Sequence, residues 1–194
     1  MNHLQYIMEW IRTPYLYGYH KNYIYHNKVA IFDLDDTLIK TASGKIFAAN
    51  KDDWKFHQNV VATLKKYNTE NYSIIIVSNQ AGLKNETKIN EWIHKLDNII
   101  KTLNIPIMIF ASFSHDEYRK PLPTFYTIIK QKFKTNGVDI VESFYCGDAC
   151  GRINDHSDTD LKFALNCQIP FYTPEHIFLQ KELPIFNIHY EPHT

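Results

Sequence analysis

The sequence predicts an α/β fold in which a Rossmann-like parallel sheet is flanked by helices. Short apolar runs alternate along the chain with longer segments whose apolar residues recur at helical spacing. The apolar runs are unbroken, as expected for strands that helices cover on both faces. With 194 residues and 44% hydrophobic content, the chain is long enough for one domain with a sizeable core.

The first predicted strand, residues 28–34, reads KVAIFDL and is bounded by polar residues. A helix is expected over residues 54–68, where Asp52 or Asp53 could cap its first turn. The second strand, residues 73–78, is again apolar and β-branched. The stretch between these two strands has room for a short β-flap and one helix, but not for a large cap domain.

The alternation continues in the second half of the chain. Residues 85–104 carry apolar side chains at helical spacing and predict an amphipathic helix. Further strands are expected at residues 106–112, 142–148 and 169–173, and further helices at residues 123–133 and 158–166. We expect a single domain over residues 1–194 with its core at about residues 28–180, an N-terminal extension of residues 1–27 and a C-terminal tail of residues 181–194.

Composition excludes several classes of protein. The formal net charge of zero argues against a protein that coats long nucleic acid by charge alone, but a local basic patch could still bind a chain end. The chain shows no signal peptide and no apolar run long enough to cross a membrane, so no membrane association is expected. Cys146, Cys150 and Cys167 form no CxxC pair. This pattern favours an intracellular, reducing compartment over a secreted disulfide framework.

Polar and reactive residues follow three of the predicted strands. Because ligands bind beyond the carboxyl ends of strands in an open parallel sheet, we expect these residues to meet in one site. A basic pair just before a proline precedes the third of these strand ends. The candidates are Asp33 and Asp35 after the first strand, Ser78 and Asn79 after the second, the pair Arg119 and Lys120, and Asp148 in the sequence GDACGR.

These residue types suit phosphoryl transfer. A carboxylate can attack a dianionic phosphate only where a metal and a cation neutralise the oxygens, and Asp33 would be that nucleophile. Asp35 would protonate the leaving oxygen and then accept a proton from water. Mg²⁺ prefers oxygen ligands, which Asp33, Asp148 and the backbone carbonyl of Asp35 would supply. Ser78 would donate to a phosphoryl oxygen, and Lys120 would neutralise charge as a point cation.

Each fragment also has a plainer interpretation. Asp33 and Asp35 could simply cap a polar loop, and Lys120 could be a solvated surface charge. The sequences SNQ and GD could each form an ordinary turn. A calcium loop is excluded, because Leu38 stands where glycine is needed and Gly44 where glutamate is needed. Further ligands for a zinc pair at Cys146 and Cys150 are not found. The order of the four motifs together favours an enzyme over these separate interpretations.

The motif order resembles that of the haloacid dehalogenase-like phosphatases. Several longer blocks are similar to the 3′-phosphatase domain of polynucleotide kinase/phosphatase: FDLDDTLIKTASGKIF, DDWKF, VSNQAGL, YRKP, CGDACGR and DLKFALNCQIPFYTPEHIF. The resemblance implies Mg²⁺-dependent hydrolysis of a 3′-phosphate at a DNA strand break, leaving a 3′-hydroxyl for a repair polymerase or ligase, in a nucleus or another DNA-containing site. It places Asp33, Asp35, Ser78, Lys120 and Asp148 on catalytic motifs and Arg119 on a neighbouring basic position.

The chain departs from the family pattern at three points. The family commonly has glycine where this chain has Asp36. The segment after GR is shorter than in animal members and lacks their lysine run. The sequence contains no GxxxxGK[ST] phosphate loop, so no 5′-kinase activity is expected from it.

Residues outside the main motifs could contact the substrate. In the predicted flap, Lys45 could contact the DNA backbone and Phe47 could stack on an end base, although Phe47 could instead pack into the core. Arg152 could bind phosphate or form a structural ion pair. Asp155 and Asp160 are expected to orient Lys120 or Arg152, or to cap the following helix. The alternative functions are a small-molecule phosphomonoesterase of the same superfamily and an inactive scaffold that binds DNA ends.

Overall fold

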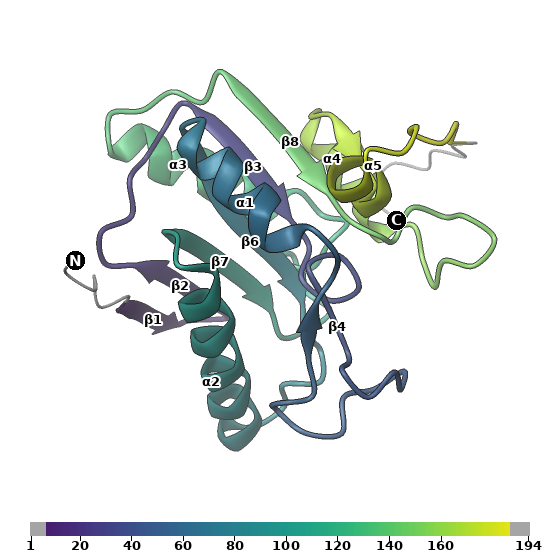
Figure 1. The fold of residues 1–194 in the computed structure, drawn as a ribbon. Helices are drawn as coiled ribbons and strands as arrows, with labels where there is room; N and C mark the ends of the chain where they lie inside the picture. Colours follow the sequence, from purple (N-terminus) through teal and green to yellow (C-terminus); the bar gives the residue numbers. More distant parts are fainter. Residues whose placement is uncertain (1–6, 187–194) are drawn as a thin grey trace.

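The computed structural model describes residues 7–186 and contains a seven-stranded sheet of order β1-β2-β7-β6-β3-β8-β9 (Figure 1). The strands from β7 to β9 are all parallel, which confirms the predicted sheet. The central strands β3 and β6 are apolar and almost entirely buried, as expected where helices cover both faces. The strand bounds are β1 Met8–Arg12, β2 Tyr15–His20, β3 Lys28–Phe32, β6 Tyr72–Asn79, β7 Ile107–Ser112, β8 Glu142–Cys146 and β9 Phe171–Tyr172.

Strands β1 and β2 were not predicted, and they lie within the segment that the sequence assigned to an N-terminal extension. They form an antiparallel hairpin that pairs with the outer edge of β7. A Cβ atom on Gly18 would lie 2.3 Å from the ring of Trp10, so this glycine leaves room for the Trp10 ring to lie over β2. Trp10 Nε1 in turn donates to Asp97 Oδ1 at 3.2 Å. The outer parts of the predicted extension and tail, residues 1–6 and 187–194, lie outside the described residues.

Helices cover both faces of the sheet (Figure 1). One face carries α1 (Val60–Thr69), α2 (Glu86–Leu103) and α5 (Pro174–Leu179). The other carries α3 (Thr124–Thr135) and α4 (Thr159–Cys167). Two buried apolar clusters therefore form, one on each side of the sheet, and they hold the strand ends in fixed register. Among the described residues, no helix is long and apolar enough to cross a membrane.

Two helix predictions need correction. The helix expected at residues 54–68 begins only at Val60, because Lys55–Phe56 instead pairs with Ile39–Lys40 as the small sheet β5–β4. Neither Asp52 nor Asp53 caps it, since its N-cap is Asn59 in the left-handed conformation. Helix α5 was missed although Thr173 and Pro174 are a recognisable helix start, in which the Thr173 side chain accepts from the His176 N–H.

The small sheet is the base of the flap that the sequence predicted. The segment between β4 and β5, residues 41–54, is called the flap loop below. It lies beside the carboxyl ends of β3 and β6, on the side of helix α2 (Figure 1). The chain thus returns to the core after a short excursion, and a single helix, α1, leads into β6.

Candidate active site

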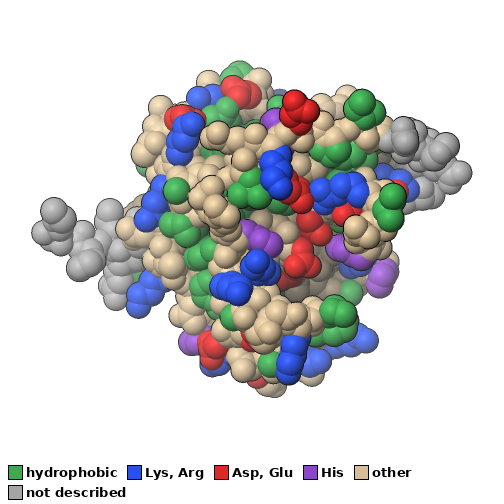
Figure 2. All heavy atoms as spheres, turned by 45° about the vertical axis from the view of Figure 1, so that its right-hand side comes forward, with side chains coloured by type: hydrophobic (Ala, Val, Ile, Leu, Met, Phe, Trp, Pro, Cys, Tyr) green, Lys and Arg blue, Asp and Glu red, His purple; other side chains and the backbone are tan. Residues whose placement is uncertain are grey.

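A cavity of about 290 Å³ lies at the carboxyl ends of β3, β6 and β8, and we call it the catalytic cavity. Figure 2 shows acidic side chains gathered at a hollow in this face, with lysine, arginine and histidine around them. Most of the predicted site residues meet here, whereas Lys45, Phe47 and Arg152 do not line the cavity. Its predicted members are Asp33, Asp35, Ser78, Asn79, Arg119, Lys120 and Asp148.

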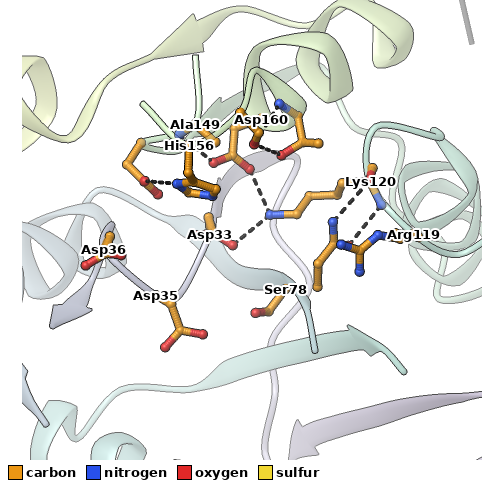
Figure 3. Close-up of a pocket in the computed structure, with 13 residues that line it drawn as sticks. Asp33, Asp35, Asp36, Ser78, Arg119, Lys120, Ala149, His156 and Asp160 are labelled. Atoms are coloured by element: carbon orange, nitrogen blue, oxygen red, sulfur yellow. Dashed lines mark hydrogen bonds and ion pairs between the residues drawn. The ribbon is translucent and has the colours of Figure 1, made fainter. Parts of the chain in front are cut away.

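A buried lysine organises the floor of the catalytic cavity (Figure 3). Lys120 is 3% exposed, and its Nζ donates to Asp33 Oδ1 at 2.6 Å, Asp160 Oδ1 at 2.8 Å and the Tyr145 hydroxyl at 2.7 Å. Burial lowers the pKa of Lys120, but Asp160 and Asp33 outweigh it and leave that pKa above its ordinary value. The ammonium therefore stays charged, and all three of its N–H donors are already in use.

Asp160 is the second carboxylate of this cluster. It accepts from the Tyr145 hydroxyl at 2.8 Å and from the Ala149 N–H at 3.0 Å. A Cβ atom on Gly147 would lie 2.4 Å from the Asp160 carboxyl carbon, so only glycine fits the turn after β8. The sequence anticipated that Asp160 could orient Lys120, but Tyr145 was missed because a tyrosine inside an apolar strand gives no signal of its own.

Asp33 and Asp148 face each other across the carboxyl ends of β3 and β8. The Asp33 N–H donates to the Cys146 carbonyl at 2.9 Å, which ties the two strand ends together. The Thr37 hydroxyl donates to Asp148 Oδ1 and accepts from the Asp148 N–H, each at 3.1 Å. Burial, with Asp160 next, raises the pKa of Asp148 to about 6. Burial also raises the pKa of Asp33, and the nearby carboxylates add to this effect while Lys120 opposes it. A further cation would relieve this repulsion.

The donor set fits a hard divalent cation. One oxygen each from Asp33, Asp148 and Asp160 lies within 4.8 Å of the others. Asp160 already binds Lys120, Tyr145 and a backbone N–H, so Asp33 and Asp148 are better placed to hold a metal. Oxygen ligands with space for water are what Mg²⁺ requires, so the residues present fit this ion.

The wall formed by β6 and the segment before α3 carries hydrogen-bond donors. Asn79 is largely occupied, because its side chain donates to the Lys120 carbonyl and accepts from the Lys120 N–H, each at 3.0 Å. Ser78 is 1% exposed and accepts from Gln80 Nε2 at 2.8 Å. Arg119 Nη1 is buried and has no hydrogen-bond partner among the described residues. An unpartnered buried guanidinium nitrogen beside the cavity is suited to bind an anion.

Asp35 stands at the edge of the catalytic cavity, where it also borders a second cavity. Its side chain is 52% exposed and points away from Asp33 (Figure 3). Gln80 Nε2 donates to Asp35 Oδ2 at 2.7 Å, and Lys95 Nζ lies 3.8 Å from Asp35 Oδ1. Neither partner was predicted. Gln80 lies in the VSNQAGL block and could have been found there, whereas Lys95 is one polar residue of an amphipathic helix and carries no distinguishing signal.

The second cavity, of about 370 Å³, lies between the flap loop and helix α2, and we call it the flap cavity. Phe47 borders it and is 84% exposed, so the alternative in which Phe47 packs into the core is wrong, and its stacking on an end base stays a prediction. Lys45 is exposed and borders neither cavity. Asp53 anchors the loop by accepting from the Ser43 N–H and hydroxyl at 2.7 Å and from the Ala49 N–H at 2.8 Å. These donors, led by Ala49, lower the pKa of Asp53 to about 2.

Arg152 forms the structural ion pair that the sequence offered as an alternative to phosphate binding. Its guanidinium donates to Asp155 at 3.0 Å, to Glu175 Oε2 at 3.1 Å and to the Asp148 carbonyl at 3.0 Å. These contacts favour the ion-pair interpretation, because the guanidinium already has partners and lies beside the cavity instead of lining it, whereas its binding of phosphate stays an untested prediction. His156, which was not predicted, does line the cavity, with Nδ1 3.9 Å from Asp148 Oδ2.

Comparison with known proteins places this chain in a family. A family model described as polynucleotide kinase 3 phosphatase matches residues 28–178. The chain belongs to this family. The predicted resemblance and the predicted class of enzyme, a phosphoric monoester hydrolase, are thereby confirmed.

Three relatives show how much of the chain is shared. A bifunctional polynucleotide phosphatase/kinase of Schizosaccharomyces pombe is 41% identical over 78% of this chain, which spans only 38% of that relative. The polynucleotide 3′-phosphatase ZDP of Arabidopsis thaliana is 32% identical over 78% of this chain and 24% of its own length. An uncharacterized 20.8 kDa protein of Autographa californica nuclear polyhedrosis virus is 36% identical over 90% of this chain and 98% of its own length.

Solved structures support the fold. A D,D-heptose 1.7-bisphosphate phosphatase from B. bronchiseptica, complexed with magnesium and phosphate, has a TM-score of 0.58 at 19% identity and covers 81% of this chain and 88% of its own. A putative HAD-like phosphatase from Mesorhizobium loti has a TM-score of 0.59 at 13% identity, over 86% of this chain and 78% of its own. The haloacid dehalogenase-like fold predicted from the motif order is therefore confirmed.

Proposed function

We propose that this chain is a Mg²⁺-dependent 3′-phosphatase that converts 3′-phosphate ends of DNA strand breaks into 3′-hydroxyl ends. The observation that carries the proposal is the pairing of Asp33 with the buried Lys120 ammonium at 2.6 Å, on the floor of a cavity that Asp148 also lines. In a member of a polynucleotide phosphatase family, this is the arrangement that an aspartyl-phosphate mechanism needs.

In the first step, a carboxylate oxygen of Asp33 attacks the phosphorus and the bond from phosphorus to O3′ breaks. Asp35 gives its proton to the departing O3′, so the strand leaves as a 3′-hydroxyl. In the second step, Asp35 takes a proton from water, and the water oxygen attacks the phosphorus of the Asp33 acyl phosphate. Inorganic phosphate leaves, and both carboxyl groups return to their starting state.

Other residues prepare the site for these steps. Lys120 orients Asp33 and supplies positive charge, because its N–H donors are already used within the protein. Arg119 Nη1 and the Ser78 hydroxyl are the groups placed to donate to phosphoryl oxygens. Asp33 and Asp148 would hold Mg²⁺, which when bound neutralises charge on the phosphate and keeps the nucleophile ionised.

Access to the site supports a bulky substrate. Asp35 and Asp36 border both the catalytic cavity and the flap cavity. Because Asp35 must contact the leaving oxygen, the strand that carries this oxygen would leave through the flap cavity, past Phe47. The catalytic unit is proposed to be the predicted core, residues 28–180. The predicted context is a DNA-containing, reducing compartment such as a nucleus, where a polymerase or ligase uses the 3′-hydroxyl.

The test compares substrates. The purified chain with Mg²⁺ is given a nicked duplex bearing a 3′-phosphate, the same duplex bearing a 5′-phosphate, and a panel of small phosphate monoesters. We expect rapid release of phosphate only from the duplex that bears a 3′-phosphate. Turnover of small esters alone would replace the proposal with a small-molecule phosphatase, and no turnover of any substrate would favour a scaffold that binds DNA ends.

The first variant prediction concerns the nucleophile. Asp33→Asn can still accept a hydrogen bond from Lys120, but its amide cannot attack phosphorus. We expect at least about a 10⁴-fold loss of kcat on the 3′-phosphate duplex, with binding of that duplex retained. Phosphate release and fluorescence anisotropy measure the two quantities. Activity within a factor of ten of the native chain would remove Asp33 from this role.

A further inference from the structure

Lys95 is an unusual lysine for its position on helix α2. Its side chain is only 13% exposed, although lysines of a helix surface normally extend into water. Among the described residues, the one carboxylate within ion-pair distance of its ammonium is Asp35, with Oδ1 at 3.8 Å. Helix α2 thus places the Lys95 ammonium next to Asp35, the proposed general acid, although Lys95 belongs to none of the sequence motifs.

The other oxygen of Asp35 is held as well. Gln80 Nε2 donates to Asp35 Oδ2 at 2.7 Å, and Gln80 is itself fixed by its backbone. The Gln80 N–H donates to the Ser112 carbonyl at 2.8 Å, and its carbonyl accepts from the Leu83 N–H at 3.1 Å. One oxygen of Asp35 therefore accepts a hydrogen bond and the other faces an ammonium at ion-pair distance, and together these contacts restrain the orientation of the carboxyl plane.

Asp35 needs such support more than the other site residues. Its side chain is half exposed, whereas the side chain of Asp33 is 11% exposed. A general acid must stay within hydrogen-bond distance of the leaving oxygen, and a freely rotating carboxyl group would often be out of reach.

We propose that Lys95 is a positioning residue for Asp35 and holds the general acid at the boundary of the two cavities. Gln80 is the second support of the same group. The inference rests on the proposed 3′-phosphatase function. A different role for Lys95, direct contact with the phosphodiester backbone of the strand, would be equally compatible with its charge, and the test is designed to separate the two.

The test uses two oligonucleotide ends that differ in one atom. One ends in a 3′-phosphate, and the other has sulfur in place of the bridging O3′ of that phosphate. A thiolate leaves without help from an acid, since thiols ionise near pH 8.5 and alcohols do not. Contacts with the strand are otherwise the same. The quantity compared is kcat/KM, which reports the steps up to cleavage of the bond to the strand.

For Lys95→Met, we expect kcat/KM on the 3′-phosphate end to fall about tenfold or more, mainly through kcat. On the 3′-thio end it should change less than about twofold. Binding of the oligonucleotide, measured on an Asp33→Asn background, should stay the same. Lys88→Met serves as the matched control, because Lys88 lies two turns earlier on α2 and borders neither of the two cavities described above. It should leave all of these values unchanged.

The other outcomes overturn the inference. Equal losses on both ends together with weaker binding would make Lys95 a contact for the strand. Equal losses with a lower Tm would make its role structural, and unchanged rates would leave it without a role in the reaction. The native chain is measured before any variant. If it releases no phosphate from the 3′-phosphate end, the proposed function itself is wrong, and this result differs from every outcome that concerns Lys95 alone.

Discussion

Around Lys120 the active site is held by buried charges with several partners each, whereas the flap loop is anchored by one aspartate and has an exposed tip. Lys120 and Asp160 are 3% and 2% exposed and form hydrogen bonds with each other. On the flap, Asp53 accepts from the backbone N–H groups of Ser43 and Ala49, while Ile46 and Phe47 between them are 92% and 84% exposed. Asp35 lines both the catalytic cavity and the flap cavity, so the two regions meet at this residue.

This difference matches what the proposed function requires of each region. The groups that make and break bonds tolerate little displacement, so they are placed on strand ends and locked by hydrogen bonds. A loop that meets a DNA end gains from an open, apolar tip, because stacking on a base is tolerant of sequence. Changes near Lys120 should therefore affect stability and chemistry together, whereas changes in the flap loop should affect substrate binding alone.

The largest effect is expected at Asp160. Asp160→Asn removes one of the two carboxylates that neutralise Lys120 and places an amide donor near the Ala149 N–H. Loss of one partner of a buried ion pair costs about 3–5 kcal/mol, so we expect a fall of that size in the free energy of unfolding and a large loss of kcat. Urea denaturation and phosphate release measure the two effects.

Asp158→Asn is the control for this change. Asp158 lies at the start of the same helix and pairs with Lys162 at 3.1 Å, but its side chain is 45% exposed. Loss of an exposed pair should cost less than about 1 kcal/mol. If Asp160→Asn proved no more destabilising than Asp158→Asn, the buried cluster would not be the rigid part of the site.

A smaller and different effect is expected at Asp53. Asp53→Ala removes the acceptor for Ser43 and Ala49, so the flap loop should lose its anchor while the sheet stays intact. We expect KM for the 3′-phosphate duplex to rise about three- to tenfold, with kcat and the turnover of p-nitrophenyl phosphate little changed. Faster amide hydrogen exchange confined to residues 41–54 would accompany it.

Asp52→Ala is the matched control for the flap, because Asp52 is the exposed neighbour and contributes only backbone hydrogen bonds to the loop. Its N–H donates to the Asn50 side chain, and its carbonyl accepts from the Trp54 N–H, so the substitution keeps both bonds. It should leave KM unchanged. If Asp53→Ala instead lowered turnover of p-nitrophenyl phosphate as much as that of DNA, the flap loop would be part of the catalytic machinery and the contrast between the two regions would fail.

The same contrast explains how much the sequence could predict. Strand ends could be found because apolar runs identify β3, β6 and the second half of β8, and the polar residues that follow them must meet at one edge of the sheet. Lys120 was found through its proline-flanked motif. Tyr145 and Lys95 were not, because their roles depend on contacts between elements that are far apart in sequence.

Local sequence patterns gave wrong predictions of secondary structure where pairing with a distant strand outweighs the local helix propensity. Residues 54–59 look helical, yet Lys55–Phe56 pairs with β4 and Asn59 adopts a left-handed conformation, so α1 starts late. The hairpin β1–β2 was missed because an edge hairpin rich in tyrosine lacks the continuous apolar run of a central strand. Arg152 could not be assigned from sequence, since its partner Glu175 lies in helix α5, which was not predicted.

The smallest effect is expected at Asp36, which stands where the family commonly has glycine and which borders both cavities. Its φ of 58° lies in the left-handed region, so the backbone itself accounts for a preference for glycine. Aspartate tolerates this region better than most residues, and its N–H donates to the Ile39 carbonyl at 2.7 Å. Asp36→Gly should therefore change the free energy of unfolding by less than about 1 kcal/mol.

The charge of Asp36 should matter more than its backbone. An exposed carboxylate near a dianionic phosphate opposes binding, so Asp36→Gly should lower KM for the 3′-phosphate duplex about two- to threefold at low salt, and the difference should shrink as salt is added. Asp36→Asn separates the two causes, because asparagine tolerates the left-handed region but carries no charge. The same gain in both variants would assign the effect to charge. A gain in Asp36→Gly alone would assign it to the backbone and make this turn, rather than the flap loop, the adaptable part of the site.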